Sequence, residues 1–161
     1  MRNSVVIVGS GLAGYGVARE IRKLNSELPI EMFSADHGGF YSKPMLSNAL
    51  SSGKNPDSIL NGDAAKMASQ LKISIRPFCR VTLIDQERHT ITLSDGEKII
   101  YGQLVLALGA DQVCLPLSGN GTEGILTVND LDDYRKFRDA LVDRERVCII
   151  GAGLIGCEFA N

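Results

Sequence analysis

The sequence lacks tryptophan, holds only two histidines and has no C-x-x-C pair among its four cysteines. Without clustered cysteines and histidines it offers no zinc-type ligand set, and we predict no metal site. Its net charge of −2 and the absence of a basic run argue against a nucleic-acid partner. No apolar run approaches the roughly 20 residues that cross a bilayer. We therefore expect a globular chain with no membrane insertion, located in the cytoplasm.

The cysteines are far apart in the sequence, and two of them lie in segments that we predict to be ordered. Cys148 falls in a predicted buried strand and Cys157 in a predicted helix. Such positions favour small buried apolar side chains over reactive thiols. We extend this interpretation to the other two, Cys79 and Cys114.

One phrase occurs twice in the chain. Residues 5–18 read VVIVGSGLAGYGVA and residues 147–160 read VCIIGAGLIGCEFA, with seven of the fourteen aligned positions identical. Both copies contain Gly-x-Gly-x-x-Gly after a short β-branched run. This spacing predicts a dinucleotide-binding turn when a strand precedes it and a helix follows. The chain therefore contains two candidate turns of this kind.

The first 35 residues predict a strand, a helix and a second strand. The strand covers 4–8, helical spacing of apolar residues covers 12–25, and Pro29 precedes a strand at 30–34. This is a βαβ unit with a parallel sheet. The stretch 35–62 is irregular and long for a connection, which favours a functional loop.

Residues 63–150 predict short strands and two helices. Asp95-Gly96 is a strong hairpin signal. The charged helix that ends at Val142 is interpreted as a solvated face. The predicted helices are 63–71 and one from Asn129 or Asp130 through Val142, and the strands are 73–76, 80–85, 90–93, 98–101, 104–107 and 147–150.

The first glycine turn has the residues that a dinucleotide requires. Gly9 permits the tight turn, Gly11 lets the backbone approach a pyrophosphate, and Gly14 lets the helix pack against the strand. The amide groups and dipole at the start of the helix favour the phosphate charge. Asp36 lies 22 residues after Gly14, where a carboxylate can accept hydrogen bonds from a ribose. Asp36 could also be an ordinary turn residue.

Four stretches together resemble one family. VVIVGSGLAGYGVAREIRKL, YSKPMLS, LVLALGA and GAGLIGCEFA are similar, in this order, to the flavoprotein pyridine-nucleotide oxidoreductases with two dinucleotide folds. GLAGY, YSKPMLS and GLIGCEFAN are most similar to the rubredoxin–NAD reductases of bacteria. The resemblance implies FAD at the first turn and NAD(P)H at the second. It also implies a Rossmann-like FAD-binding domain, with a parallel sheet and a β-meander, followed by the start of an NAD-binding Rossmann unit.

The resemblance also assigns individual residues. Lys43 and Pro44 match a basic-Pro pair beside the flavin, although Lys43 could be an exposed loop lysine. Asn48 departs from the lysine of many ferredoxin-reductase relatives. The residues implied for FAD are Gly9, Gly11, Leu12, Ala13, Gly14, Asp36, Lys43, Pro44, Val81, Ala107, Leu108 and Gly109. The residues implied for NAD(P)H are Gly151, Gly153, Ile155, Gly156 and Glu158.

A missing cysteine pair separates this chain from the disulfide reductases of the same superfamily. Residues 37–60 contain no cysteine, so no dithiol relay follows the first turn. The resemblance then implies hydride transfer from NADH to the flavin and single electrons passed on to rubredoxin. Ferredoxin or a flavorubredoxin are alternative carriers, and a nucleotide-binding module without redox activity is an alternative of another class. No residue is predicted to be catalytic.

Chains of this family are more than twice as long, so we expect an amino-terminal fragment that is inactive on its own. The expected parts are an FAD-binding part over 1–110, a connecting segment over 111–145 and a truncated NAD-binding part over 146–161. The residue that decides between NAD and NADP is expected at the end of the strand that follows the helix of the second glycine turn. That position lies beyond residue 161, so the choice stays open.

Overall fold

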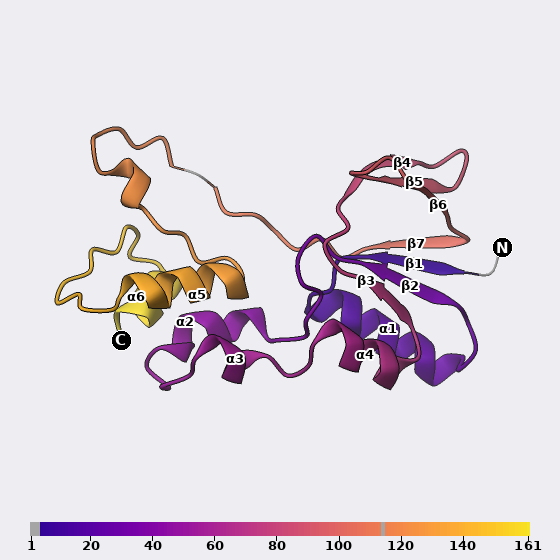
Figure 1. The fold of residues 1–161 in the computed structure, drawn as a ribbon, viewed down its shortest axis with the longest axis horizontal. Helices are drawn as coiled ribbons and strands as arrows, with labels where there is room; N and C mark the ends of the chain where they lie inside the picture. Colours follow the sequence, from indigo (N-terminus) through magenta and orange to yellow (C-terminus); the bar gives the residue numbers. More distant parts are fainter. Residues whose placement is uncertain (1–3, 114) are drawn as a thin grey trace. The chain divides into compact units, whose positions relative to one another are not determined.

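The computed structural model describes residues 4–113 and 115–161, which form two compact units (Figure 1). The first unit runs to Tyr41 and resumes over Leu60–Gly109, whereas the second comprises Ser42–Ile59 and Ala110–Asn161. The expected parts 1–110, 111–145 and 146–161 are defined by the cofactor sites that they form or connect, whereas the two units are defined by their internal contacts. The expected parts therefore stay a prediction.

A four-stranded parallel sheet forms the centre of the first unit, in the order β3-β2-β1-β7. Its strands are β1 (Val5–Val8), β2 (Ile30–Phe33), β3 (Ser74–Arg76) and β7 (Gln103–Leu106). All four residues of β1 are buried, as expected for a central parallel strand covered on both faces. Helix α1 (Leu12–Leu24) connects β1 to β2, which confirms the predicted βαβ unit.

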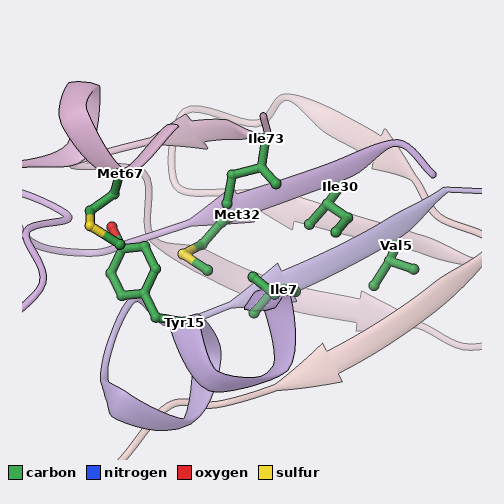
Figure 2. Packing of buried hydrophobic residues seen from close by; sticks show 8 residues of the cluster. Val5, Ile7, Tyr15, Ile30, Met32, Met67 and Ile73 are labelled. Atoms are coloured by element: carbon green, nitrogen blue, oxygen red, sulfur yellow. The ribbon is translucent and has the colours of Figure 1, made fainter. Parts of the chain in front are cut away.

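Helices α1 and α4 (Ala64–Leu71) cover one face of this sheet (Figure 1). Because side chains alternate along a strand, Val5 and Ile7 of β1 point toward the helices. Figure 2 shows Tyr15 of α1 beside Met67 of α4 within this layer. Its buried members are Val5, Ile7, Tyr15, Ala18, Ile30, Met32, Met67 and Ile73.

An antiparallel meander covers the other face. It consists of β4 (Val81–Asp85), β5 (Thr90–Leu93) and β6 (Lys98–Ile100). The predicted hairpin between β5 and β6 is confirmed: Gly96 has a φ of +89°, and the Glu97 amide donates to the Asp95 carboxylate at 2.9 Å. The core on this face contains Val6, Val8, Phe33, Ile91, Leu93 and Tyr101.

Tyr15 joins α1 to the loop that follows β2. The side chain is fully buried, its hydroxyl donates to the Gly38 carbonyl, and its ring meets the edge of Phe40 with centroids 5.3 Å apart. Burial and the negative charge of Asp36 raise the pKa of Tyr15 to about 12. The fold therefore holds this phenol in its neutral form.

We expect the Tyr15 hydroxyl to stabilise the chain at neutral pH and to destabilise it in alkali. Between pH 10 and 12 the unfolded tyrosine loses its proton while the folded one keeps it, so stability falls as the pH rises. At pH 8 the free energy of unfolding of the native chain should exceed that of Tyr15→Phe by about 1 kcal/mol, because the variant lacks the hydrogen bond. By pH 11.5 the native chain should have lost about 2 kcal/mol relative to the variant, which reverses the order. Urea unfolding followed by circular dichroism measures both values, and a constant difference would contradict the assignment.

The segment Ser42–Ile59, which separates the two parts of the first unit, is closed at its ends by a backbone bridge. We call this segment the excursion. The Phe40 amide donates to the Gly62 carbonyl at 2.8 Å, and the Asn61 amide donates to the Phe40 carbonyl at 2.9 Å. The segment 35–62 was predicted to be irregular, which is wrong in part. It contains η1 (Lys43–Met45), α2 (Leu46–Ala49) and α3 (Pro56–Ile59), each too short to give a periodic pattern.

Helix α5 (Leu131–Ala140) packs on this segment within the second unit. The Tyr134 hydroxyl and the Arg138 guanidinium both donate to the Lys54 carbonyl, at 3.0 and 2.9 Å. Asp130 caps the helix by accepting from the Asp133 amide at 2.8 Å. The helix has the predicted solvated face, whereas Leu131 and Tyr134 on its other face are buried. The remaining elements of this unit are η2 (Thr122–Gly124) and α6 (Leu154–Ala160).

Two predictions near the second glycine turn are wrong. Residues 147–150 form no strand, and the side chains of Val147 and Ile150 are 55% and 56% exposed. A strand needs a neighbour for its amides and carbonyls, and no strand of the described residues pairs with this segment. Cys148 and Cys157 are consequently exposed rather than buried, whereas Cys79 is half-buried. Cys114 lies outside the described residues.

Candidate dinucleotide-binding turns

Two of the three glycines in the first turn are required by the fold itself. Gly9 has a φ of +109°, and a Cβ there would lie 2.1 Å from the Ala107 carbonyl oxygen. A Cβ on Gly14 would lie 2.0 Å from the Gly9 carbonyl oxygen. Any larger residue at either position therefore collides with backbone that cannot move aside.

Gly11 differs, because neither its backbone conformation nor a neighbouring atom requires glycine at this position. Its φ is −73°, and a Cβ there would meet nothing within 4 Å. Gly11 is the N-cap of α1 and provides no side-chain cap, so amides of the first turn lack that partner. An anion could reach these amides only if position 11 carries no side chain. Leu12 and Ala13 follow at the exposed start of the helix.

Asp36 lies close to this turn, just beyond the end of β2. The pairing of β1 with β2 continues past the strands, where the Gly9 amide donates to the Phe33 carbonyl at 2.8 Å. The half-buried Asp36 carboxylate accepts through Oδ1 from the Ser34 hydroxyl and from the Gly38 amide, the latter at 2.8 Å. The structure thus brings the predicted acidic residue to the first turn.

The other predicted residues of the first unit lie near the carboxyl ends of β1 and β7. Val81 and Leu108 line an apolar pocket of about 240 Å³ together with Val8 and Leu106. Ala107, the residue after β7, places its carbonyl against Gly9. Gly109, two residues further along the chain, has a φ of +72°. Ligands of open parallel sheets bind at this edge.

Lys43 and Pro44 belong to the second unit. Both are exposed in the 3-10 helix η1, and the Lys43 ammonium donates to the Ala110 carbonyl at 3.4 Å. Among the residues that the structure describes, this long bond is the one hydrogen bond of the Lys43 side chain, which leaves the exposed ammonium accessible to a ligand.

The second turn repeats the geometry of the first. Gly151 has a φ of +112°, and a Cβ on Gly156 would lie 2.1 Å from the Gly151 carbonyl oxygen. Gly153 is the N-cap of α6, and a Cβ there would meet nothing within 4 Å. Gly151 is thus favoured by its backbone conformation and Gly156 by packing, whereas neither reason applies to Gly153. Ile155 is 63% exposed on the first turn of α6.

Glu158 connects this second turn to α2. Its carboxylate accepts a hydrogen bond from the buried Ser47 hydroxyl. The neighbouring Phe159 ring packs edge-on against Phe137 of α5, with centroids 5.3 Å apart. Sequence reasoning missed Ser47, because a serine 111 positions away gives no spacing signal. The bond holds the second turn against the segment that begins with Lys43.

The described residues contain no group of three histidine, cysteine or acidic side chains arranged for a metal ion. Among the same residues, none of the helices is both long enough and apolar enough to cross a bilayer.

A family profile described as pyridine nucleotide-disulphide oxidoreductase matches residues 3–161. The chain belongs to this oxidoreductase family. It is 51% identical to a rubredoxin-NAD(+) reductase of Acinetobacter baylyi over 98% of its own length. It spans 41% of the length of that relative. The family membership confirms the predicted resemblance and places both glycine turns within one family profile.

Solved structures of oxidoreductases have the same fold. A ferredoxin reductase for the CYP199A2 system from Rhodopseudomonas palustris superposes with a TM-score of 0.87 at 33% identity. An NADH:rubredoxin oxidoreductase from Clostridium acetobutylicum gives 0.80 at 27% identity. Each comparison covers 98% of this chain, and 39% and 40% of the respective structures. The predicted α/β fold with a parallel sheet and a meander is confirmed.

Proposed function

We propose that the chain is the cofactor-binding part of an NADH-dependent flavoprotein reductase that passes electrons through FAD to a small iron protein. The observation that carries the proposal is that each turn has one glycine, Gly11 or Gly153, that neither packing nor a positive φ requires. Two adenine dinucleotides, FAD and NADH, explain two such openings. The similarity to a rubredoxin-NAD(+) reductase supports rubredoxin as the first candidate for the carrier.

FAD fits the first turn. Its pyrophosphate would lie over Gly11 and meet the amides at the start of α1, while its adenosine ribose would meet Asp36. Lys43, which belongs to the second unit, stays a predicted residue for the flavin. When bound, the flavin would accept a hydride from NADH and release single electrons to the carrier. The chain itself provides position and charge, and we assign no residue to acid–base catalysis.

NADH fits the second turn on the same grounds. Its pyrophosphate would lie over Gly153, the N-cap of α6, where neither a positive φ nor packing requires glycine. Glu158 stays a predicted cofactor residue, but its carboxylate repels phosphate and is held by Ser47. Its charge suits a hydrogen-bond donor of a cofactor. A cytoplasmic location also stays a prediction.

The test uses a fusion, in which these 161 residues replace the matching part of the Acinetobacter baylyi relative. We expect the fusion to be yellow, to be bleached by NADH and to reduce added rubredoxin. Faster reduction of a ferredoxin or a flavorubredoxin under the same conditions would favour that carrier instead. Binding of nucleotides without bleaching would indicate a module without redox activity.

The cysteines provide a control for the direct route to the carrier. Alkylating them in the fusion should leave rubredoxin reduction largely intact, because the described residues place no cysteine pair near the first turn. Loss of turnover with an unchanged circular dichroism spectrum would show that a thiol relay takes part.

A further inference from the structure

Two buried serine hydroxyls lie next to Asp36, and no part of the proposed function so far uses them. Ser10 and Ser34 are only 5% and 3% exposed. Their Oγ atoms are 2.7 Å apart, and the Ser34 hydroxyl donates to Oδ1 of Asp36. Ser10 Oγ lies 3.4 Å from the same oxygen. The three side chains form a continuous chain of hydrogen bonds between the glycine turn and the end of β2.

The direction of this chain follows from the number of protons. An ionised carboxylate only accepts hydrogen bonds, and each serine hydroxyl has one proton to donate. Ser34 gives its proton to Asp36, so its oxygen is the acceptor at the contact with Ser10. Ser10 therefore donates to Ser34. The charge of Asp36 aligns both hydroxyls, and such charge-assisted bonds are stronger than neutral ones.

The consequence is a fixed carboxylate. Oδ1 of Asp36 accepts from the Ser34 hydroxyl and from the Gly38 amide, the latter at 2.8 Å. Among the described residues no hydrogen bond is formed by Oδ2. With one oxygen held by two donors, rotation about the side-chain bonds is restricted, and Oδ2 is the oxygen available to a ligand.

We propose that Ser10 and Ser34 are positioning residues for the adenosine ribose of FAD. They hold Asp36 so that Oδ2 accepts from a ribose hydroxyl when the pyrophosphate lies over Gly11. This inference rests on the proposed function, since it requires FAD at the first turn. Ser10 lies between Gly9 and Gly11, so one backbone segment sets both the phosphate contact and the ribose contact.

The experiment compares two ligands in the fusion: FAD, and an FAD analogue whose adenosine ribose lacks the 2′- and 3′-hydroxyls. We expect the native fusion to bind the analogue at least tenfold more weakly than FAD, because the bond to Asp36 is lost. Ser34→Ala and Ser10→Ala should weaken FAD binding by about tenfold and leave binding of the analogue unchanged. Removing a positioning group has no effect on a ligand that lacks the positioned contact.

The control variant is Ser26→Ala, which removes an exposed hydroxyl that bonds only to the adjacent Glu27 among the described residues. It should bind both ligands as the native fusion does. If circular dichroism shows that Ser34→Ala does not fold, the test rests on Ser10→Ala. Ser10 is the end member of the hydrogen-bond chain, so its removal breaks only the bond to Ser34. Equal losses for FAD and for the analogue would mean a purely structural role and overturn the inference alone. A native fusion that binds no FAD would overturn the proposed function as well.

Discussion

Replacing Gly11 with valine is expected to abolish FAD binding while leaving the fold intact. A Cβ at position 11 meets nothing within 4 Å, and its φ of −73° suits any residue, so the protein accommodates the new side chain. The isopropyl group would occupy the space in which a pyrophosphate must approach the amides of α1. We expect at least a hundredfold loss of affinity in the fusion, measured by flavin fluorescence titration, with an unchanged urea midpoint.

Two other glycines of α1 provide matched controls for this substitution. Gly16→Val also adds a side chain where nothing lies within 4 Å, but it lies past the first turn of the helix and should bind FAD normally. Gly14→Val should instead unfold the first unit, because its Cβ would lie 2.0 Å from the Gly9 carbonyl oxygen. Normal flavin content in Gly11→Val would refute the assignment of FAD to this turn.

Replacing Gly153 with valine is expected to leave FAD bound and to reduce the rate of flavin reduction by NADH at least a hundredfold. The second turn is formed by residues of the second unit, whereas Gly11 and Asp36 belong to the first, so the two losses should separate. Stopped-flow bleaching of the fusion by NADH measures the effect. Reduction of the same flavin by dithionite should be unchanged and shows that the cofactor remains competent.

Gly124→Val is the matched control for the second turn. It adds the same side chain at an open position of the second unit, away from the glycine turn, and should be reduced by NADH like the native fusion. If Gly153→Val lost its flavin while the remaining holoprotein kept normal NADH kinetics, the assignment of the two cofactors would have to be reversed.

Much of the first unit is predictable because its signals are local. The run of apolar residues in β1, the glycines after it and the helical spacing through Leu24 lie within one continuous stretch. Asp95 and Gly96 determine their turn by themselves. The structure places the predicted residues Gly9, Gly11 and Asp36 at one edge of the sheet, as the βαβ topology requires.

The predictions that failed concern contacts with distant residues. The strand at 147–150 has the composition of β1, but a strand forms only against a neighbour, and the described residues provide none. The hydrogen bonds of Ser10 with Ser34 and of Ser47 with Glu158 join residues 24 and 111 positions apart. No periodicity reports such pairs. The one-turn helices in 43–59 are too short to have a hydrophobic face.

The bridge between Phe40 and Gly62 should let the first unit tolerate sequence changes in the segment that it closes. It fixes both ends of the excursion over Ser42–Ile59, so the sheet and its two covering layers are complete whatever the excursion contains. Lengthening a closed loop adds little entropic cost, which grows only with the logarithm of its length. Insertions or exchanges in this segment should therefore be accepted without loss of the sheet. Mutations in this segment should therefore destabilise the first unit little. During evolution the second unit can change in sequence and length there while the first turn and its glycines stay unchanged.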